Sequence, residues 1–265
     1  MAIEVFNRYE NKFMLNEEQY QAIMKELPKY MEEDAYCRNG GIYTIANIYY
    51  DTENDAMIRK SLQKPPYKEK VRMRAYGTPD GKSTTFVEIK KKYNHIVNKR
   101  RVTMTYDEAM AYMTEDVHPD NPKVNKQVLR ELDYMKEFYH LVPKLYLSYD
   151  RQAFFGKDDH EFRLTFDNNI QTRRYDLNLS SGPYGEQLLP PGMRIMEIKI
   201  SQATPQWFVD ILSANKIYQT SFSKYGTEYK NYVKNNFRQG ENVLCSNQYS
   251  LPQTQVSKQG SHCCA

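Results

Sequence analysis

The sequence lacks the features that membrane, secreted and many hydrolytic proteins require. Its longest apolar runs, such as "IANIYY" and "IMEIKI", are far shorter than the roughly 20 residues that span a bilayer. The opening "MAIEVFNRYENKF" has no secretory apolar segment. Four cysteines lack the spacing of a disulfide framework, and five histidines form no convincing Ser/His/Asp or Cys/His set. We therefore expect a soluble, cytoplasmic protein that does not use a side chain as a catalytic nucleophile.

Composition indicates one globular domain followed by a tail. Hydrophobic residues make up 40% of the chain and charged residues 26%, which is typical of a folded protein. From about residue 238 the chain is polar and without periodicity, so we expect a domain over 1–236 and a disordered tail over 237–265. A zinc site in this tail would need adjacent cysteines, which fit zinc spacing poorly, so we do not favour it. Its candidate ligands are Cys245, His262, Cys263 and Cys264.

Strand-forming segments outnumber helical ones. Eight stretches rich in Tyr, Ile, Val, Phe and Thr are expected as strands: 3–13, 43–51, 67–76, 84–92, 98–105, 144–155, 160–167 and 193–200. Helices are expected after Asn16, whose capping box includes Gln19, near 54–62, 107–114 and 123–140, after Thr204 and over 223–236. Several neighbouring strands have connections too short for a parallel crossover, which predicts an antiparallel sheet.

The segment "EKVRMRAYG" shows the charge pattern that recurs along the chain. Lys70, Arg72 and Arg74 share one face of the expected strand, while Val71 and Met73 share the other. Charged residues also alternate with apolar ones in "RYENK", "FVEIKKK", "RLTFD" and "IMEIKI". Any one such face could simply be solvated. Five in phase favour a common charged interior with helices covering the apolar faces.

We therefore predict an α+β fold, an antiparallel eight-stranded β-barrel tunnel with helices packed outside. Its lumen would hold more cations than carboxylates. Because burying unpaired charge is costly, this surplus implies a multivalent anionic ligand. The net charge of +4 is too small to predict one by itself.

Seven motifs in order resemble the polyphosphate polymerase domain of the vacuolar transporter chaperone (VTC) family, a branch of the triphosphate tunnel metalloenzymes. They are "RYENKF", "KVRMRAYG", "FVEIKKK", "YDRQAFFG", "RLTFD", "MEIKI" and "SKYGTEY". The resemblance covers residues 1 to about 236. It implies a basic β-tunnel that grips a nucleoside triphosphate and a growing polyphosphate, with a divalent metal held by a carboxylate.

The resemblance also implies a role for individual residues. Those matched to the catalytic phosphate-binding positions are Lys12, Arg72, Arg74, Lys90, Arg151, Arg163 and Lys224. Further expected phosphate contacts are Arg8, Lys92, Arg100, Arg101, Lys199 and Ser223. Mn²⁺ or Mg²⁺ is expected at Glu197, with Glu10 as a second ligand, and Glu88 and Asp167 could supply further oxygen atoms. From the residues alone, a cross-strand salt bridge explains Glu197 equally well.

Three activities remain open at this level. The resemblance implies an ATP-dependent polymerase that extends polyphosphate or pyrophosphate. Triphosphate-hydrolysing relatives open with Glu-x-Glu-x-Lys, and here Arg8 replaces the first acid, which favours polymerisation. The alternatives are a tunnel triphosphatase and a non-catalytic polyphosphate sensor. Nucleic acid is not expected as a ligand, because the 23 tyrosines lie mainly at apolar strand positions. A membrane-protein partner that exports the product stays possible.

Overall fold

A computed structural model describes residues 9–37, 41–94, 96–122, 124–201 and 203–238. By its internal contacts the chain divides into residues 1–230, which include the whole sheet, and residues 231–265. The last helix runs to Arg238, and the rest of the predicted tail lies outside the described residues. In the described part, no helix is long and apolar enough to cross a membrane.

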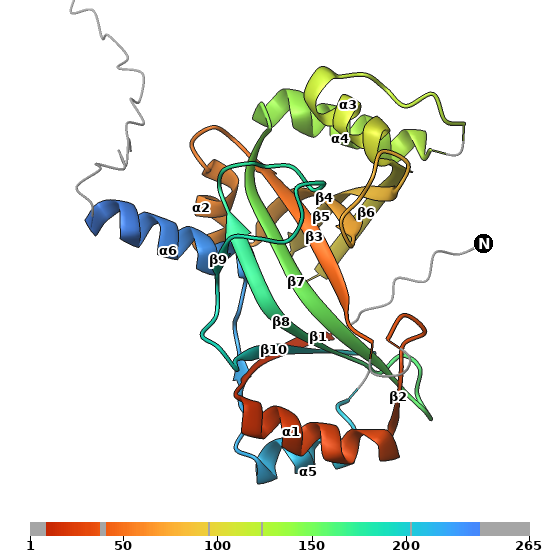
Figure 1. The fold of residues 1–265 in the computed structure, drawn as a ribbon, viewed down its shortest axis with the longest axis vertical. Helices are drawn as coiled ribbons and strands as arrows, with labels where there is room; N and C mark the ends of the chain where they lie inside the picture. Colours follow the sequence, from red (N-terminus) through yellow and green to blue (C-terminus); the bar gives the residue numbers. More distant parts are fainter. Residues whose placement is uncertain (1–8, 38–40, 95, 123, 202, 239–265) are drawn as a thin grey trace, which may run out of the picture. The chain divides into compact units, whose positions relative to one another are not determined.

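One antiparallel sheet dominates residues 1–230 (Figure 1). Its strands are β1 (Tyr9–Leu15), β2 (Met31–Glu33), β3 (Tyr43–Asp51), β4 (Tyr67–Tyr76), β5 (Thr84–Tyr93), β6 (Ile96–Thr105), β7 (Val142–Gly156), β8 (Arg163–Arg173), β9 (Glu186–Gln187), β10 (Arg194–Ile200) and β11 (Gln219–Thr220). The order is β11-β1-β10-β8-β7-β3-β4-β5-β6, with β2 beside β7 and β9 beside β8.

The α+β class and the antiparallel sheet are confirmed, but the closed eight-stranded barrel is wrong. The sheet has 11 strands and is not closed. Among the described residues, β6 pairs with β5 alone and β11 with β1 alone. Closure requires the two edge strands to hydrogen-bond to each other, and β11 offers only two residues. Side-chain alternation specifies the faces of a strand but carries no information on whether two distant edges meet.

Six α-helices lie in the described part, with bounds near those expected. They are α1 (Glu17–Glu26), α2 (Ala56–Leu62), α3 (Tyr106–Glu115), α4 (Lys126–Tyr139), α5 (Gln206–Ala214) and α6 (Lys224–Arg238). The capping box at Asn16 and Gln19 is confirmed, since each side chain bonds the other's backbone N–H. The helix expected to begin at Pro205, with Thr204 as its cap, begins one residue later at Gln206, and Pro205 occupies the N-cap position.

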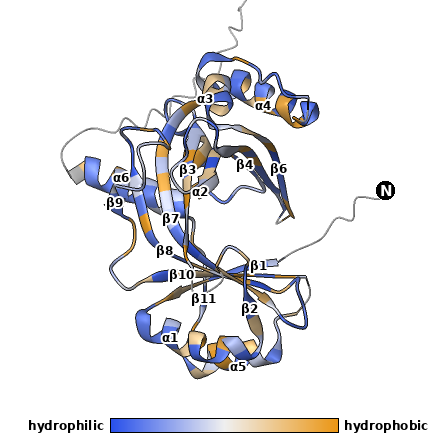
Figure 2. Cartoon of the chain, turned by 45° about the vertical axis from the view of Figure 1, so that its right-hand side comes forward, coloured by the Kyte–Doolittle hydropathy of each residue, from blue (hydrophilic) through white to orange (hydrophobic). Residues whose placement is uncertain are grey.

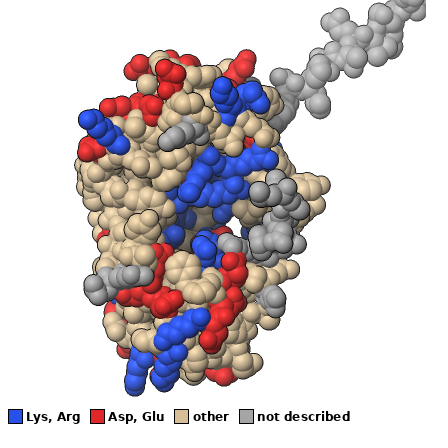
Figure 3. All heavy atoms as spheres, turned by 90° about the vertical axis from the view of Figure 1, so that its right-hand side faces the viewer, with Lys and Arg blue, Asp and Glu red and all other residues tan. Residues whose placement is uncertain are grey.

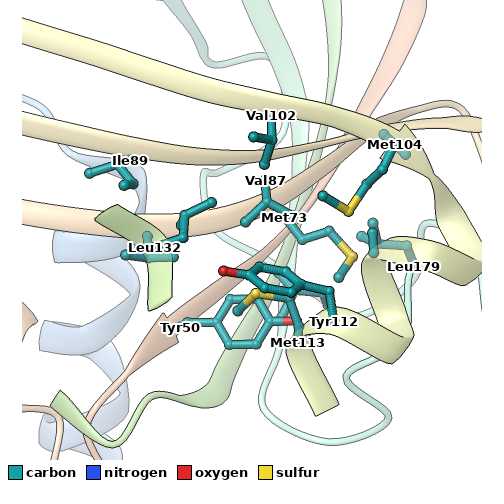
Figure 4. Packing of buried hydrophobic residues seen from close by; sticks show 14 of the residues in the cluster. Tyr50, Met73, Val87, Ile89, Val102, Met104, Tyr112, Met113, Leu132 and Leu179 are labelled. Atoms are coloured by element: carbon teal, nitrogen blue, oxygen red, sulfur yellow. The ribbon is translucent and has the colours of Figure 1, made fainter. Parts of the chain in front are cut away.

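Helices cover the apolar faces of the sheet in two clusters (Figure 2). In the first, Met73 and Val87 of the sheet pack with Tyr112 of α3 and Leu132 of α4, as Figure 4 shows. The second joins β1, β8 and β10 to α1 and α5. Val71 and Met73 are fully buried, as predicted. Each such side chain contributes about 1.5–3 kcal/mol. The opposite faces of the same strands are thereby left for the charged residues.

Candidate functional site

Charged side chains from both ends of the strand order meet on the face opposite the helices. Lys90 Nζ of β5 lies 3.8 Å from Glu10 Oε2 of β1, although five strands separate β5 from β1 in the sheet. The sheet therefore curls so that its outer strands approach each other. We call the following set the charged concave face: Glu10, Lys12, Lys70, Arg72, Arg74, Glu88, Lys90, Lys99, Arg151, Asp167, Glu197, Lys199 and Lys224. Figure 3 shows Lys and Arg side chains bordering a hollow in one face of the molecule.

Glu88 of β5 is the buried counter-ion of three cations. Arg72 NH2 lies 2.7 Å from its Oε2, Lys99 Nζ lies 2.6 Å from its Oε1, and Arg74 NH1 lies 3.9 Å away. Burial raises the pKa of Glu88, but Arg72, Arg74 and Lys99 outweigh it and bring the pKa to about 2. Glu88 is thus ionised at neutral pH and fixes the two arginines in place before any ligand binds.

Tyrosines of β3 and β7 hold the other sides of these arginines. Arg72 NH1 donates to Tyr49 Oη at 3.1 Å, and Arg74 NH2 donates to Tyr149 Oη at 3.2 Å. Burial raises the pKa of Tyr49, yet Arg72, Lys70 and Arg74 lower it to about 8. The lowered pKa results from the three cations that surround this buried phenol. The site therefore favours an anion.

Asp167 of β8 forms a second buried centre. Arg151 donates to both carboxylate oxygens, at 2.7 and 2.8 Å, in the bidentate geometry that arginine favours. Lys224 Nζ, at the start of α6, lies 2.5 Å from Oδ2. Burial raises the pKa of Asp167, but Arg151 and Lys224 bring it to about 2. Beside Lys224, Ser223 accepts a hydrogen bond from Lys70 at 3.2 Å.

Strands β1 and β10 each contribute one lysine and one glutamate to a cluster in which opposite charges are neighbours. Lys12 lies opposite Glu197, and Glu10 lies opposite Lys199. Lys12 Nζ is 3.3 Å from Glu10 Oε1 and 3.4 Å from Glu197 Oε2, while Lys199 Nζ is 3.2 Å from Glu197 Oε1. Burial raises the pKa of Glu197, and the cations Lys199 and Lys12 bring it well below its usual range. The cross-strand ion pair considered for Glu197 is present.

The remaining predicted site residues lie apart from these pairs. Arg163 faces Lys199 across the strands and stacks on Phe155 at 4.8 Å, with its buried Nε lacking a hydrogen-bond partner in the described part. Lys92 lies opposite Lys68. Arg101 lies opposite Glu88, over the ring of Phe86. The predicted residue Arg100 does not join the face, because it pairs with Glu131 of α4 on the helix side. The predicted residue Arg8 lies outside the described residues.

Sequence reasoning missed Lys99 and the two arginine-holding tyrosines. Lys99 lies opposite Lys90 in the β5–β6 hairpin, and its side chain reaches Glu88. Alternation through "NKRRV" would have selected Lys99 and Arg101 rather than the adjacent pair Arg100 and Arg101. No local signal marks Tyr49, whose neighbours Ile48 and Tyr50 are apolar or aromatic, whereas Tyr149 stands two residues before Arg151 in "YDRQAFFG" and so shares its face.

Comparison with known proteins supports the sequence resemblance. The sequence profile of the VTC domain matches residues 7–233 of this chain. No curated protein matches the sequence. A Hippeastrum protein described as a candidate adenylyl cyclase with a dominant triphosphatase activity is similar in structure, with a TM-score of 0.50 and 13% identity over 88% of this chain and 95% of that one. A Bacillus halodurans protein described as a candidate adenylate cyclase has a TM-score of 0.49 and 13% identity over 81% and 92%.

Proposed function

Because this chain belongs to the VTC domain family, we propose that it is an ATP-dependent polyphosphate polymerase. A terminal oxygen of the polyphosphate acceptor attacks the γ-phosphorus of ATP. The new P–O bond forms as the bond between the γ-phosphorus and the β,γ-bridging oxygen breaks, and ADP leaves with that oxygen. For phosphoryl transfer of this kind, the protein mainly has to position the two phosphate groups and neutralise their charge.

The observation that carries the proposal is the excess of fixed cations on the charged concave face. Lysines and arginines there outnumber carboxylates by more than two to one, and none of the residues in the set is a cysteine, histidine or serine nucleophile. Arg72, Arg74 and Arg151 are already oriented by Glu88, Tyr149 and Asp167, so their remaining N–H groups are ready to bind phosphate oxygens. We assign phosphate binding to these arginines and to Lys12, Lys90, Arg163 and Lys224.

The carboxylates near Lys12 fit a divalent metal held jointly with substrate. The described residues contain no group of three or more His, Cys, Asp or Glu side chains that could hold a metal by themselves. Glu10 and Glu197, which both contact Lys12, provide the one or two carboxylates with which proteins hold Mg²⁺ or Mn²⁺ beside phosphate oxygens. When bound, such an ion would neutralise charge on the phosphates. When no ion is bound, the charge of Lys12 would partly balance that of the two carboxylates.

A tunnel triphosphatase is the second candidate. The Hippeastrum protein of similar fold is described as having a dominant triphosphatase activity. The two activities share the donor and differ in the acceptor, which is water for hydrolysis and a phosphate oxygen for polymerisation. A third candidate, a polyphosphate sensor, binds the chain without turnover.

The products of ATP turnover distinguish these activities. We expect the purified protein, incubated with ATP and Mn²⁺ or Mg²⁺, to form an acid-labile polymer together with ADP. Arg72→Ala and Glu197→Gln should each abolish polymer formation, whereas Lys25→Ala on the exposed surface of α1 should leave it unchanged. Free phosphate as the only product would favour the triphosphatase. Thermal stabilisation by polyphosphate with no product would favour the sensor.

A further inference from the structure

A buried ion pair outside the charged concave face holds the beginning of α6. Glu228 Oε1 and Oε2 accept hydrogen bonds from Arg174 Nε and NH2, at 2.8 and 2.9 Å, in a bidentate pair. Arg174 directly follows the last residue of β8, and its NH1 lies 3.4 Å from Asp55, the N-cap residue of α2. All three side chains are at most 15% exposed. The pair therefore joins α6 to the end of β8 and to α2.

The first two turns of α6 contact β8 a second time, at the charged concave face. Lys224 pairs with Asp167 within β8, and Glu228 pairs with Arg174 just beyond the end of that strand. Lys224 and Glu228 are four residues apart, which is about one helical turn. Because a helix moves as a rigid element, a shift at Glu228 is transmitted to Lys224.

The chemistry of the Glu228–Arg174 pair favours a fixed geometry more than it favours stability. Burial raises the pKa of Glu228, although the hydrogen bonds from Arg174 act in the opposite direction. An apolar pair of similar volume would hold the helix about as firmly, because it avoids the cost of burying two charges. It would, however, tolerate sliding, whereas a guanidinium and a carboxylate pair in one bidentate geometry. Such precision matters where a helix carries a long, flexible lysine to a phosphate.

We propose that Glu228 is a positioning residue: through its bidentate pair with Arg174 it fixes the register of α6 on β8 and so holds the Lys224 ammonium where phosphate binds. This rests on the proposed function, which assigns phosphate binding to Lys224. Neither Glu228 nor Arg174 belongs to the charged concave face, so both act through Lys224. Their effect on phosphate affinity should therefore depend on the presence of Lys224.

A double-mutant cycle on phosphate affinity tests this dependence. We expect Glu228→Gln alone to weaken the binding of tripolyphosphate by roughly five- to tenfold, and by less than about twofold when Lys224→Ala is also present. Isothermal titration calorimetry without ATP gives the four affinities of the cycle. The matched control is Glu137→Gln on the exposed surface of α4, which should leave the affinity unchanged.

A second variant tests the same pair if Glu228→Gln fails to fold. Arg174→Lys keeps a positive charge beside Glu228 but loses the bidentate geometry. We expect it to weaken tripolyphosphate binding by a similar factor, again only while Lys224 is present. Circular dichroism and thermal unfolding establish that each variant is folded at the temperature of the titration.

Two results would overturn the positioning role of Glu228. One is the same loss of affinity with and without Lys224, which a merely structural role predicts, and the other is an unchanged affinity in either folded variant. An unmodified protein that does not bind tripolyphosphate would overturn the proposed function together with this role. A protein that shows the dependence on Lys224 but forms no polymer from ATP would overturn the polymerase proposal and support the role of Glu228.

Discussion

The charged concave face and its continuation along the ends of β4 and β5 differ in how their cations are arranged. Around Glu88 and Asp167, arginines are paired with buried carboxylates and held by tyrosine hydroxyls. At the ends of β4 and β5, Lys70 lies opposite Lys90 and Lys68 lies opposite Lys92, and we call these four residues the lysine ladder. The paired part is therefore preorganised, whereas the lysine ladder carries repulsion between like charges that lie opposite each other. Changing one charge should accordingly have opposite effects on stability in the two parts.

The largest expected effect follows from removing a buried counter-ion. Glu88→Gln would leave Arg72, Arg74 and Lys99 without their shared carboxylate, and we expect a loss of about 3–5 kcal/mol in the free energy of unfolding. Urea denaturation measures it. Glu131→Gln, in a partly exposed pair with Arg100, is the control and should cost at most about 1 kcal/mol. An equally small loss of unfolding free energy in Glu88→Gln and Glu131→Gln would contradict the difference between the buried and the exposed ion pair.

Acid should weaken the paired part next in magnitude. Glu88 and Asp167 have a pKa of about 2 in the folded protein, against about 4 in an unfolded chain. A carboxyl group whose pKa is lower in the folded protein stabilises the fold fully at a pH above its pKa in the unfolded chain. This stabilisation is lost as the pH falls from about 5 toward 2. We expect each to contribute about 3 kcal/mol at neutral pH. Urea unfolding at pH 7, 5 and 3 measures the decline in the free energy of unfolding, which Asp167→Asn should make shallower. An equally steep decline in Asp167→Asn would contradict the low pKa of Asp167.

The smallest effect should have the opposite sign. Lys92→Gln removes one charge from the outer rung of the ladder, so we expect the unliganded protein to gain about 0.2–1 kcal/mol of stability. Thermal unfolding in phosphate-free buffer measures this gain. Lys82→Gln, an exposed lysine in the loop at the other end of the same hairpin, should leave the melting temperature unchanged. A loss of stability in Lys92→Gln would show that the ladder is compensated without ligand.

Much of the site could be predicted because strand alternation is a local property. The alternation in "EKVRMRAYG" placed Arg72 and Arg74 on one face and Val71 and Met73 under helices, and the structure has them there. Arg100 was misplaced because two adjacent arginines cannot share a face; alternation puts Arg100 on the face of the apolar Val102, and the hairpin register agrees by placing Arg101 opposite Glu88. Tyr49, which holds Arg72, comes from β3, where no charged neighbour in sequence marks it, and only the pairing of β3 with β4 brings it to the site.

By itself, the sequence determined the α+β class, the positions of most helices and strands, the family and the cationic character of one face, because each follows from residue order within a segment. The tertiary structure decided which cations have partners. Glu88 and Asp167 pair with several of them, whereas no carboxylate of a described residue lies within ion-pair distance of Lys68, Lys70 or Lys92. It also decided that the sheet stays open. Both depend on contacts between strands far apart in the chain, which sequence periodicity does not encode.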